Sequence, residues 1–306
     1  MKPAGKNQTV FFLLAIVVLL WGLNSASIKY LTQFYPPLAL APLRLLLASA
    51  LLLTIMSRQH GFSKLPREAW PPIAGVAFFC IFLHQIALTV GIKATSSTHA
   101  VLILGTSPLF TTLLAALCFN ESFTAAKGLG ILLGFSGLLF VVTGGSQGES
   151  SLSGDFIVAI ATITFVIGSF FVKKAATLVS PLVVTAYSHV LGFAGLLLLG
   201  IFVNPVWSLP GNLEFWPIAV LLFSSFMSTA VGAILWNMSI QKIGASTASL
   251  FQNATPVIGV FASAIFLGEK LSWQHPAALS LVVLGVSFGT GMIKLPDFIK
   301  AKKQES

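Results

Sequence analysis

Residues 97–121 read STHAVLILGTSPLFTTLLAALCFNE, and a related stretch, STASLFQNATPVIGVFASAIFLGEK, begins at Ser246. In a register of 148 residues the matching pairs are Ala100 and Ala248, Pro108 and Pro256, Glu121 and Glu269, and Gly137 and Gly285. Each stretch is apolar over the roughly 20 residues that cross a bilayer. Each also carries a proline near its midpoint, where the ring removes a backbone hydrogen bond. The repetition therefore predicts two membrane helices, each broken near its centre.

The two breaks predict where a functional site lies. A proline frees the carbonyl one turn before it, which here means Leu104 and Gln252. In hydrocarbon such a break is tolerated only inside protein or against a watery cavity. Interrupted helices at matching places in two halves are typical of transport sites. We therefore expect Pro108 and Pro256 to lie beside a central cavity.

The composition places the chain in a membrane. Of its 306 residues 56% are hydrophobic and 8% are charged, whereas a soluble domain carries about 25% charged residues. The mean hydropathy is +0.94. Ten apolar runs are found, at about 10–29, 38–57, 72–91, 97–119, 125–143, 154–173, 182–203, 216–238, 246–267 and 275–293. We expect an all-α integral membrane protein with ten transmembrane helices, and we attribute its net charge of +9 to membrane orientation and not to nucleic-acid binding.

The basic residues predict the orientation of the chain. With a cytoplasmic N-terminus, thirteen of the seventeen Lys and Arg residues fall on the cytoplasmic side and three on the other, and Arg44 lies within a run. Cytoplasmic loops carry this excess in membrane proteins. We expect a multi-pass protein with both termini in the cytoplasm. The first run resembles a cleaved signal peptide, but its counterpart in the second half favours a membrane helix.

The repeat extends over the whole chain. Pro37 matches Pro181 at a shift of 144 residues, and Trp70 matches Trp216 at a shift of 146. We therefore expect residues 1–148 and 149–306 to be two copies of a five-helix unit. Because five is odd, the second copy enters the membrane from the opposite face, and the two form inverted repeats around the cavity. Glycines in runs 125–143 and 275–293 predict close helix packing, at the rim of a monomer or at a homodimer face.

These features resemble the EamA family of the drug/metabolite transporter superfamily, which comprises ten-helix bacterial permeases. The resemblance is carried by Trp21-Gly22-Leu23-Asn24, Lys29, Pro36-Pro37-Leu38, Leu43-Arg44, Ser96-Ser97-Thr98, Pro108, Asn120-Glu121, Ser246-Thr247-Ala248, Pro256 and Leu267-Gly268-Glu269-Lys270. It implies two inverted five-helix halves around a cavity in the bacterial inner membrane, and export of amino acids or related metabolites. Asn120 and Phe165 depart from the family pattern, so the resemblance does not identify the substrate.

Polar and aromatic side chains at membrane depth are the candidates for the cavity, because such groups are costly in hydrocarbon. The predicted cavity residues are Trp21, Asn24, Ser25, His84, Gln85, Thr229, Trp236, Gln252 and Asn253. Interhelical hydrogen bonding is the alternative role for the amides and hydroxyls. A neutral structural imidazole is the alternative for His84, and an anchor at the membrane interface is the alternative for Trp236.

Five other ionisable side chains are expected to lie outside the cavity. We expect Arg44 to reach the outer interface or helix-end carbonyls, and the alternative role for this side chain is to attract an anionic substrate. We expect His99 to be solvated at the outer end of its helix. His189 is expected to be structural. Glu121 and Glu269 are expected to fasten each half, through a nearby lysine or a helix N-terminus.

These candidates favour a carrier over other classes of protein. An intramembrane enzyme would need paired carboxylates, a metal-spaced His/Asp cluster or a Ser–His pair on one face, and the sequence offers none. We therefore expect no enzyme activity, no catalytic residue, no metal and no cofactor. We predict an exporter of small metabolites such as amino acids, working by alternating access with the lipid bilayer as its other partner. A lipid or polyprenyl-linked flippase and an importer of a small metabolite stay open, as do proton coupling and facilitated diffusion.

Overall fold

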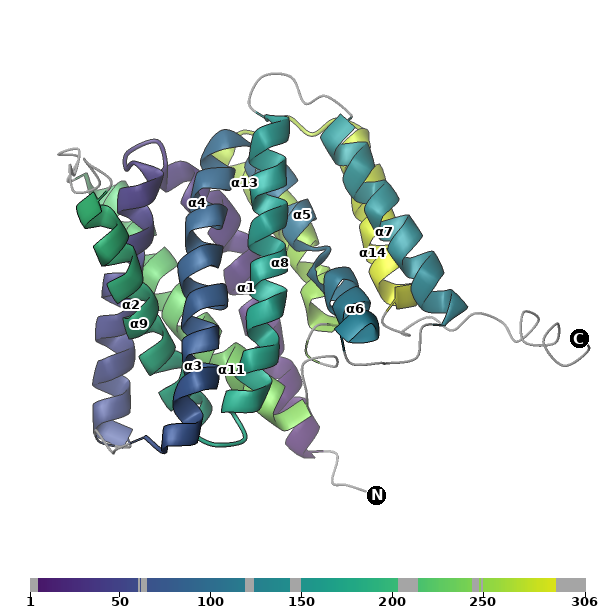
Figure 1. Ribbon diagram of the computed structural model, residues 1–306. Helices are drawn as coiled ribbons and strands as arrows, with labels where there is room; N and C mark the ends of the chain where they lie inside the picture. Colours follow the sequence, from purple (N-terminus) through teal and green to yellow (C-terminus); the bar gives the residue numbers. More distant parts are fainter. Residues whose placement is uncertain are drawn as a thin grey trace, which may run out of the picture.

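The computed structural model describes residues 5–59, 61, 65–118, 124–143, 150–202, 214–243, 248 and 250–289. The regular structure in these ranges is helical, without a strand. The longest unbroken helices in these ranges are α1 (Gly5–Leu31), α2 (Pro37–Gln59), α8 (Leu152–Ala175) and α9 (Pro181–Phe202). They lie in one bundle, in which α2 and α8 stand nearly upright and α1 and α9 are tilted (Figure 1). The predicted all-α class is therefore confirmed for the described residues.

The third apolar run of each half is a composite helix. The first consists of η1 (Arg67–Ala69), α3 (Trp70–Val76), η2 (Ala77–Leu83) and α4 (His84–Ala94). The second consists of α10 (Phe215–Leu222), η3 (Phe223–Val231) and α11 (Gly232–Ile243). Both η2 and η3 are π-helical, a wide turn that is frequent at functional sites. In the register of 146 residues both segments begin at the same place in their halves, since Ala77 falls on Phe223.

The two proline-containing runs are interrupted helices. In the first half α5 (Ser97–Leu104) is separated by a two-residue turn from α6 (Ser107–Cys118). In the second half the 3-10 turn η4 (Leu250–Ala254) precedes α13 (Thr255–Leu267). Pro108 and Pro256 are the second residues of the helices that follow, a position where the missing N–H has no intrahelical partner to lose.

The two interruptions touch one another. A Cβ atom added to Gly105 would lie 2.2 Å from Cγ of Pro256. The absence of a side chain at Gly105 therefore lets the proline ring of the other half approach the backbone of the first break. Val101 and Gly259 pack together in the same way, one turn further along α5 and α13.

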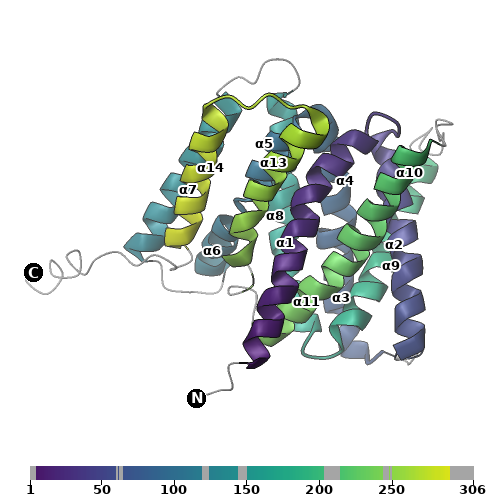
Figure 2. The same cartoon turned by 180° about the vertical axis from the view of Figure 1, so that it is seen from behind.

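Helices α7 (Ala125–Thr143) and α14 (Gln274–Gly289) form an antiparallel pair at one side of the bundle (Figures 1 and 2). A Cβ atom on Gly285 would lie 2.4 Å from the backbone nitrogen of Gly134, and one on Gly137 would lie 2.9 Å from Cβ of Leu281. The close packing predicted from these glycines is confirmed, because small residues let the two backbones approach.

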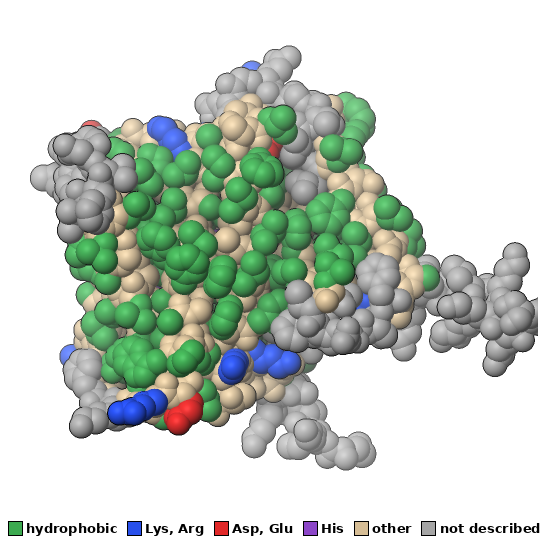
Figure 3. Space-filling view, in the orientation of Figure 1, with side chains coloured by type: hydrophobic (Ala, Val, Ile, Leu, Met, Phe, Trp, Pro, Cys, Tyr) green, Lys and Arg blue, Asp and Glu red, His purple; other side chains and the backbone are tan. Residues whose placement is uncertain are grey.

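Within the described part of the chain, seven helical segments are long and apolar enough to span a membrane. They are Thr9–Leu31, Pro37–Gln59, Arg67–Ala94, Ser97–Leu114, Leu152–Ala175, Pro181–Gly200 and Phe215–Ile243. Three shorter apolar helices are Ala125–Gly137, Phe251–Leu267 and Gln274–Phe288. One face of the bundle is mainly hydrophobic, with Lys and Arg side chains along its lower edge and also at its upper edge (Figure 3). These helices confirm a multi-pass membrane protein, while ten crossings stay a prediction.

The two largest clusters of buried apolar side chains lie around the centre of the bundle. One contains Leu14, Val76 and Trp236, together with residues of α2, α8 and α9. The other contains Ile28 and Leu88, together with residues of α2, α5 and α8. Helix α1 contributes to both clusters, and it lies in the bundle between α13 and α11 (Figure 2).

Candidate functional site

A cavity of about 140 Å³ lies inside the bundle and is lined by members of both apolar clusters. Its wall combines α1, η2, α4 and the α5–α6 break with α8, α9, η3, α11 and the η4–α13 break. Eight predicted residues line it, namely Trp21, Asn24, Ser25, His84, Gln85, Thr229, Trp236 and Gln252. The ninth, Asn253, is half-buried in η4 and is not among the lining residues. Both breaks reach the wall, through Ser107 and Thr255.

Three aromatic rings form one side of the cavity. The ring centroids of Trp21 and Trp236 are 5.3 Å apart, those of Trp21 and Phe165 are 5.7 Å apart, and those of Phe165 and Trp236 are 6.3 Å apart. Trp236 is only 4% exposed, so the alternative of an anchor at the membrane interface is wrong. The Trp21 indole N–H donates to the carbonyl of Ser228 at 3.1 Å, which fixes this ring against the π-helical segment η3.

His84 enters the cavity from the junction of η2 and α4. Its Nδ1 lies 2.8 Å from the carbonyl oxygen of Ala161 on α8. A carbonyl only accepts, so Nδ1 carries the proton and Nε2 of the neutral ring is an acceptor. His84 therefore makes the hydrogen bond to a neighbouring helix that a structural histidine would make, and it also lines the cavity.

Arg44 does not reach the membrane interface, and that prediction is wrong. Its side chain is 1% exposed and extends across the bundle. Its Nε donates to Ser224 Oγ at 2.8 Å, one terminal nitrogen donates to Gln85 Oε1 at 3.1 Å, and the other donates to Thr229 Oγ1 at 2.9 Å. Gln85 and Thr229 line the cavity, so the guanidinium lies directly behind its wall.

Several lining residues were missed by sequence reasoning because they lie on α8 and α9. They are Thr162, Phe165, Ser169, Val172, Ser188 and His189. His189 was expected to be structural and outside the cavity. Its Nδ1 does bond the carbonyl of Thr185 at 2.8 Å within α9, but the residue also lines the cavity, so its expected exclusion is wrong. Hydroxyl and imidazole groups in these apolar runs were the available signal.

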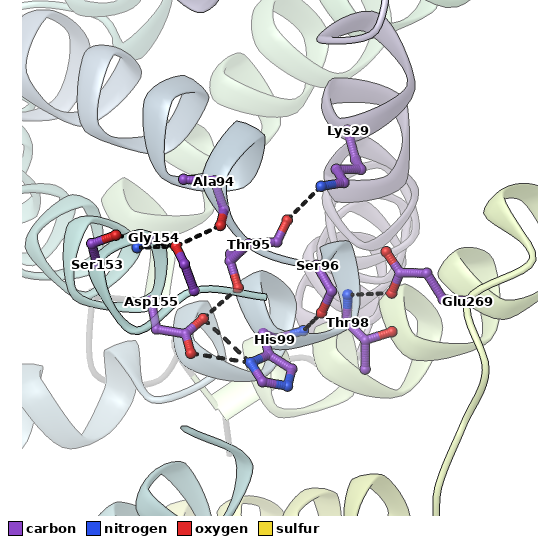
Figure 4. A network of polar contacts seen from close by, with 11 residues as sticks. Lys29, Ala94, Thr95, Ser96, Thr98, His99, Ser153, Gly154, Asp155 and Glu269 are labelled. Carbon is purple, nitrogen blue, oxygen red and sulfur yellow. Dashed lines mark hydrogen bonds and ion pairs between the residues drawn. The ribbon is translucent and has the colours of Figure 1, made fainter. Parts of the chain in front are cut away.

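A second polar cluster joins α5 to α8 at the end of the bundle where Lys29 lies (Figure 4). His99 is 2% exposed and its Nδ1 lies 3.1 and 3.3 Å from the carboxylate oxygens of Asp155, which is 3% exposed. The Thr95 hydroxyl donates to the same carboxylate at 2.5 Å. The prediction that His99 is solvated is therefore wrong, because Asp155 gives it a buried partner 56 residues away.

Glu269 connects the second half to this end of α5. Its two carboxylate oxygens accept from the backbone N–H groups of Ser97 at 2.7 Å and Thr98 at 2.9 Å (Figure 4). A carboxylate at a helix N-terminus satisfies orphan donors and complements the helix dipole. The predicted role of Glu269 at a helix N-terminus is thus confirmed. Its counterpart Glu121 lies outside the described residues, as do Ser246 and Thr247.

Several known proteins are similar to this chain in sequence or in fold over nearly their whole lengths. The chain is 30% identical to the uncharacterized transporter YyaM of Bacillus subtilis (strain 168), over 96% of this chain and 97% of YyaM. It is 26% identical to a probable amino-acid metabolite efflux pump of Salmonella typhimurium (strain LT2), over 90% of this chain and 92% of the pump. One crystal structure has the same fold, with a TM-score of 0.68 at 19% identity over 98% of this chain and 99% of that chain. The sequence profile of the EamA-like transporter family matches residues 8–143 and 152–290. The chain is a membrane transporter that belongs to the EamA-like transporter family.

Proposed function

We propose that this transporter is a carrier, not an enzyme, that exports small amphipathic metabolites such as amino acids by alternating access. The observation that carries the proposal is the cavity, in which interrupted helices from both halves of the chain meet. Ser107 at the first break and Gln252 at the second both line it, and the Ser107 hydroxyl donates to Gln252 Oε1 at 3.0 Å. Interrupted helices beside a buried site are the general arrangement of secondary transporters.

We also propose that the chain consists of two inverted five-helix repeats with ten crossings, residues 1–148 and 149–306. Matching helices support this proposal because they run antiparallel. Val101 packs against Gly259 and Gly105 against Pro256, so α5 and α13 run in opposite directions, and α7 and α14 do the same. The separate matches of the family profile to 8–143 and 152–290 support two repeats as well.

The chemistry of the cavity supports amphipathic cargo. Three aromatic rings offer an apolar surface, while the amides of Asn24, Gln85 and Gln252 and the imidazole of His84 offer hydrogen bonds. This mixture of an apolar wall and a few convergent polar groups is typical of small-molecule sites. Outward transport is favoured by the relative in Salmonella, whose name describes efflux.

The orientation that we propose places both termini in the cytoplasm of a bacterial cell, with the protein in the inner membrane. Basic residues support it, because the excess of Lys and Arg is expected on the cytoplasmic side. Arg67, Lys173, Lys174 and Lys242 lie at the same end of the bundle as the N-terminus of α1, and Lys29 and Lys93 lie at the other end.

Transport into inverted membrane vesicles tests the proposal, with a panel of radiolabelled amino acids as probes. Accumulation of at least one amino acid above control vesicles supports a carrier, and failure of the whole panel contradicts amino-acid export.

For an amino acid that is transported, Gln252→Ala and His84→Ala should each lower the initial rate about tenfold, as expected for a loss of about 1.4 kcal/mol of binding or barrier stabilisation. Gln33→Ala, at an exposed turn, is the matched control and should transport normally. Normal rates in both cavity variants would remove these residues from the site.

A further inference from the structure

The hydrogen bonds of Arg44 determine whether the side-chain amides of Gln85 and Asn24 present their oxygen or their NH₂ group to the cavity. A guanidinium has only donors, so the Gln85 atom that lies 3.1 Å from it must be the oxygen. The NH₂ group of Gln85 is then directed to other partners. Because Gln85 lines the cavity, this amide offers the cargo donors and not acceptors.

The same reasoning fixes Asn24 through Ser224. The Ser224 hydroxyl accepts from Arg44 Nε at 2.8 Å and has a single proton of its own to give. That proton goes to Asn24 at 2.7 Å, so the accepting atom of Asn24 is its Oδ1. The NH₂ group of Asn24, which also lines the cavity, is left as a donor.

Trp236 adds a third donor by an independent observation. Its indole N–H is buried, and no hydrogen-bond acceptor reaches it among the residues that the structure describes. A buried donor without a partner costs about 1–3 kcal/mol, and this one belongs to a lining residue of the cavity. A ligand that supplies an acceptor would recover that cost.

The positive charge of Arg44 favours an anionic ligand, as the hydrogen-bond donors do. Among the described residues, Arg44 donates hydrogen bonds to a hydroxyl, an amide oxygen and a second hydroxyl, and all three groups are neutral. None of the residues that line the cavity is an aspartate or a glutamate. A buried charge is stable only when it is well compensated, so an anionic group in the cavity would be attracted to the guanidinium behind the wall.

We infer that the cavity holds its cargo by a carboxylate or a similar anionic group, which is bound on a donor wall formed by Asn24, Gln85 and Trp236. Arg44 is the positioning residue of this wall, because it orients both amides without being among the lining residues. The inference rests on the proposed carrier function and narrows its substrate class to metabolites that bear an anionic group. The rings of Trp21 and Phe165, which lie beside Trp236, would hold the apolar part of such a molecule.

Two matched pairs of probes test the inference on the purified full-length protein, L-leucine with L-leucinamide and 4-methylpentanoate with 4-methylpentanamide. Binding is measured by the shift in thermal unfolding, and exchange is measured in proteoliposomes. The carboxylate of at least one pair should bind at least tenfold more tightly than its amide. Equal binding within both pairs, preference for the amides, or no binding of any probe would overturn the inference.

Gln85→Glu separates a binding role from a structural one. The new carboxylate keeps an oxygen for Arg44 and pairs with its charge, so the folded state should be as stable as the wild type. It also removes the donor and repels an anion, so the apparent Kd or KM for the carboxylate probe should rise at least tenfold. Gln33→Glu adds the same charge at an exposed turn and should leave both values unchanged. Unchanged carboxylate affinity in Gln85→Glu would contradict the donor wall.

Failure of the inference differs from failure of the proposed function. Exchange of the amides with no preference for carboxylates would keep the carrier and remove the donor wall. Carboxylate-selective binding without any exchange would keep the donor wall and contradict the carrier.

Two variants of Arg44 test its charge. Arg44→Lys should retain part of the preference for carboxylates because the charge remains, whereas Arg44→Gln should lose this preference. Lost packing alone does not predict such a difference.

Discussion

At the scale of single residues, the protein holds buried charge in two different ways. Near one end of the bundle, the Asp155 carboxylate accepts hydrogen bonds from the His99 ring and from the Thr95 hydroxyl. Arg44 lies deeper and is surrounded by neutral oxygens. In the first arrangement the protein's own side chains compensate the Asp155 carboxylate, which suits a structural contact between α5 and α8. The second leaves a positive field beside the cavity, where a ligand can use it.

Loss of Asp155 should therefore destabilise the fold. Removing one member of a buried pair leaves the other without a partner, and such changes cost about 3–5 kcal/mol. We expect Asp155→Ala to lower the unfolding free energy by an amount of this order, measured by chemical denaturation in detergent. In the double variant with His99→Ala the loss should be smaller than the sum of the two single losses. Strict additivity would show that the two side chains do not interact.

Much of the cavity could be predicted from residue chemistry alone. Polar and aromatic groups are costly at membrane depth, so Trp21, His84 and Gln252 could be chosen without a structure. The side on which Arg44 emerges could not be predicted, because α2 is apolar around most of its circumference and its sequence does not specify a face. The pairing of His99 with Asp155 depends on how α5 packs against α8, and no local pattern encodes that contact.

At the scale of helices, the contact between the two breaks depends on a missing side chain. Gly105→Ala would place a methyl group 2.2 Å from the Pro256 ring. A proline ring cannot rotate away, so α5 and α13 must separate, at a cost of about 1–3 kcal/mol. We expect a lower unfolding temperature and reduced transport.

Gly195→Ala is the control for this prediction. Its new Cβ would lie 3.0 Å from the ring of Phe82, a side chain that can shift, so the loss of stability should be smaller. An equal or larger loss in Gly195→Ala would contradict the importance of the contact between the breaks.

The contact of Glu269 with α5 should also be measurable. Its carboxylate accepts from two N–H groups at the start of a helix that belongs to the other half of the chain. Glu269→Gln removes the charge and one of the two acceptors, so we expect a loss of about 1 kcal/mol in unfolding free energy. Glu68→Gln, at an exposed site, is the control and should have no effect. Equal stability of both variants would show that the capping contact is not stabilising.

Helix interruptions differ in how far they can be predicted. The breaks near Pro108 and Pro256 follow from the missing proline N–H and were predicted close to their observed places. The π-helical segments η2 and η3 were not predicted, since neither contains a proline and no local pattern in them indicates an extra residue in the turn. They nevertheless begin at matching positions of the two halves, Ala77 and Phe223.

At the scale of the whole molecule, the proposed transport mechanism depends on two halves with opposite orientation. An inverted repeat lets each half adopt the conformation of the other, which is the physical basis of alternating access. The duplication of the breaks follows from the sequence. The shape of the cavity does not, because the lining residues of α8 were not among the predicted cavity residues and His189 of α9 was expected to be structural.

The most direct measurement of this claim compares two matching positions from the two halves. Gln33 follows α1 and Thr177 follows α8, they are 144 residues apart in the repeat register, and both are exposed. Gln33→Cys and Thr177→Cys are made one at a time in a background where Cys80 and Cys118 are serine, and intact cells are treated with a membrane-impermeant maleimide. The account predicts that the cysteine at position 33 is labelled from outside, and that the one at 177 is labelled only after the membrane is opened. Labelling of both from the same side would contradict it.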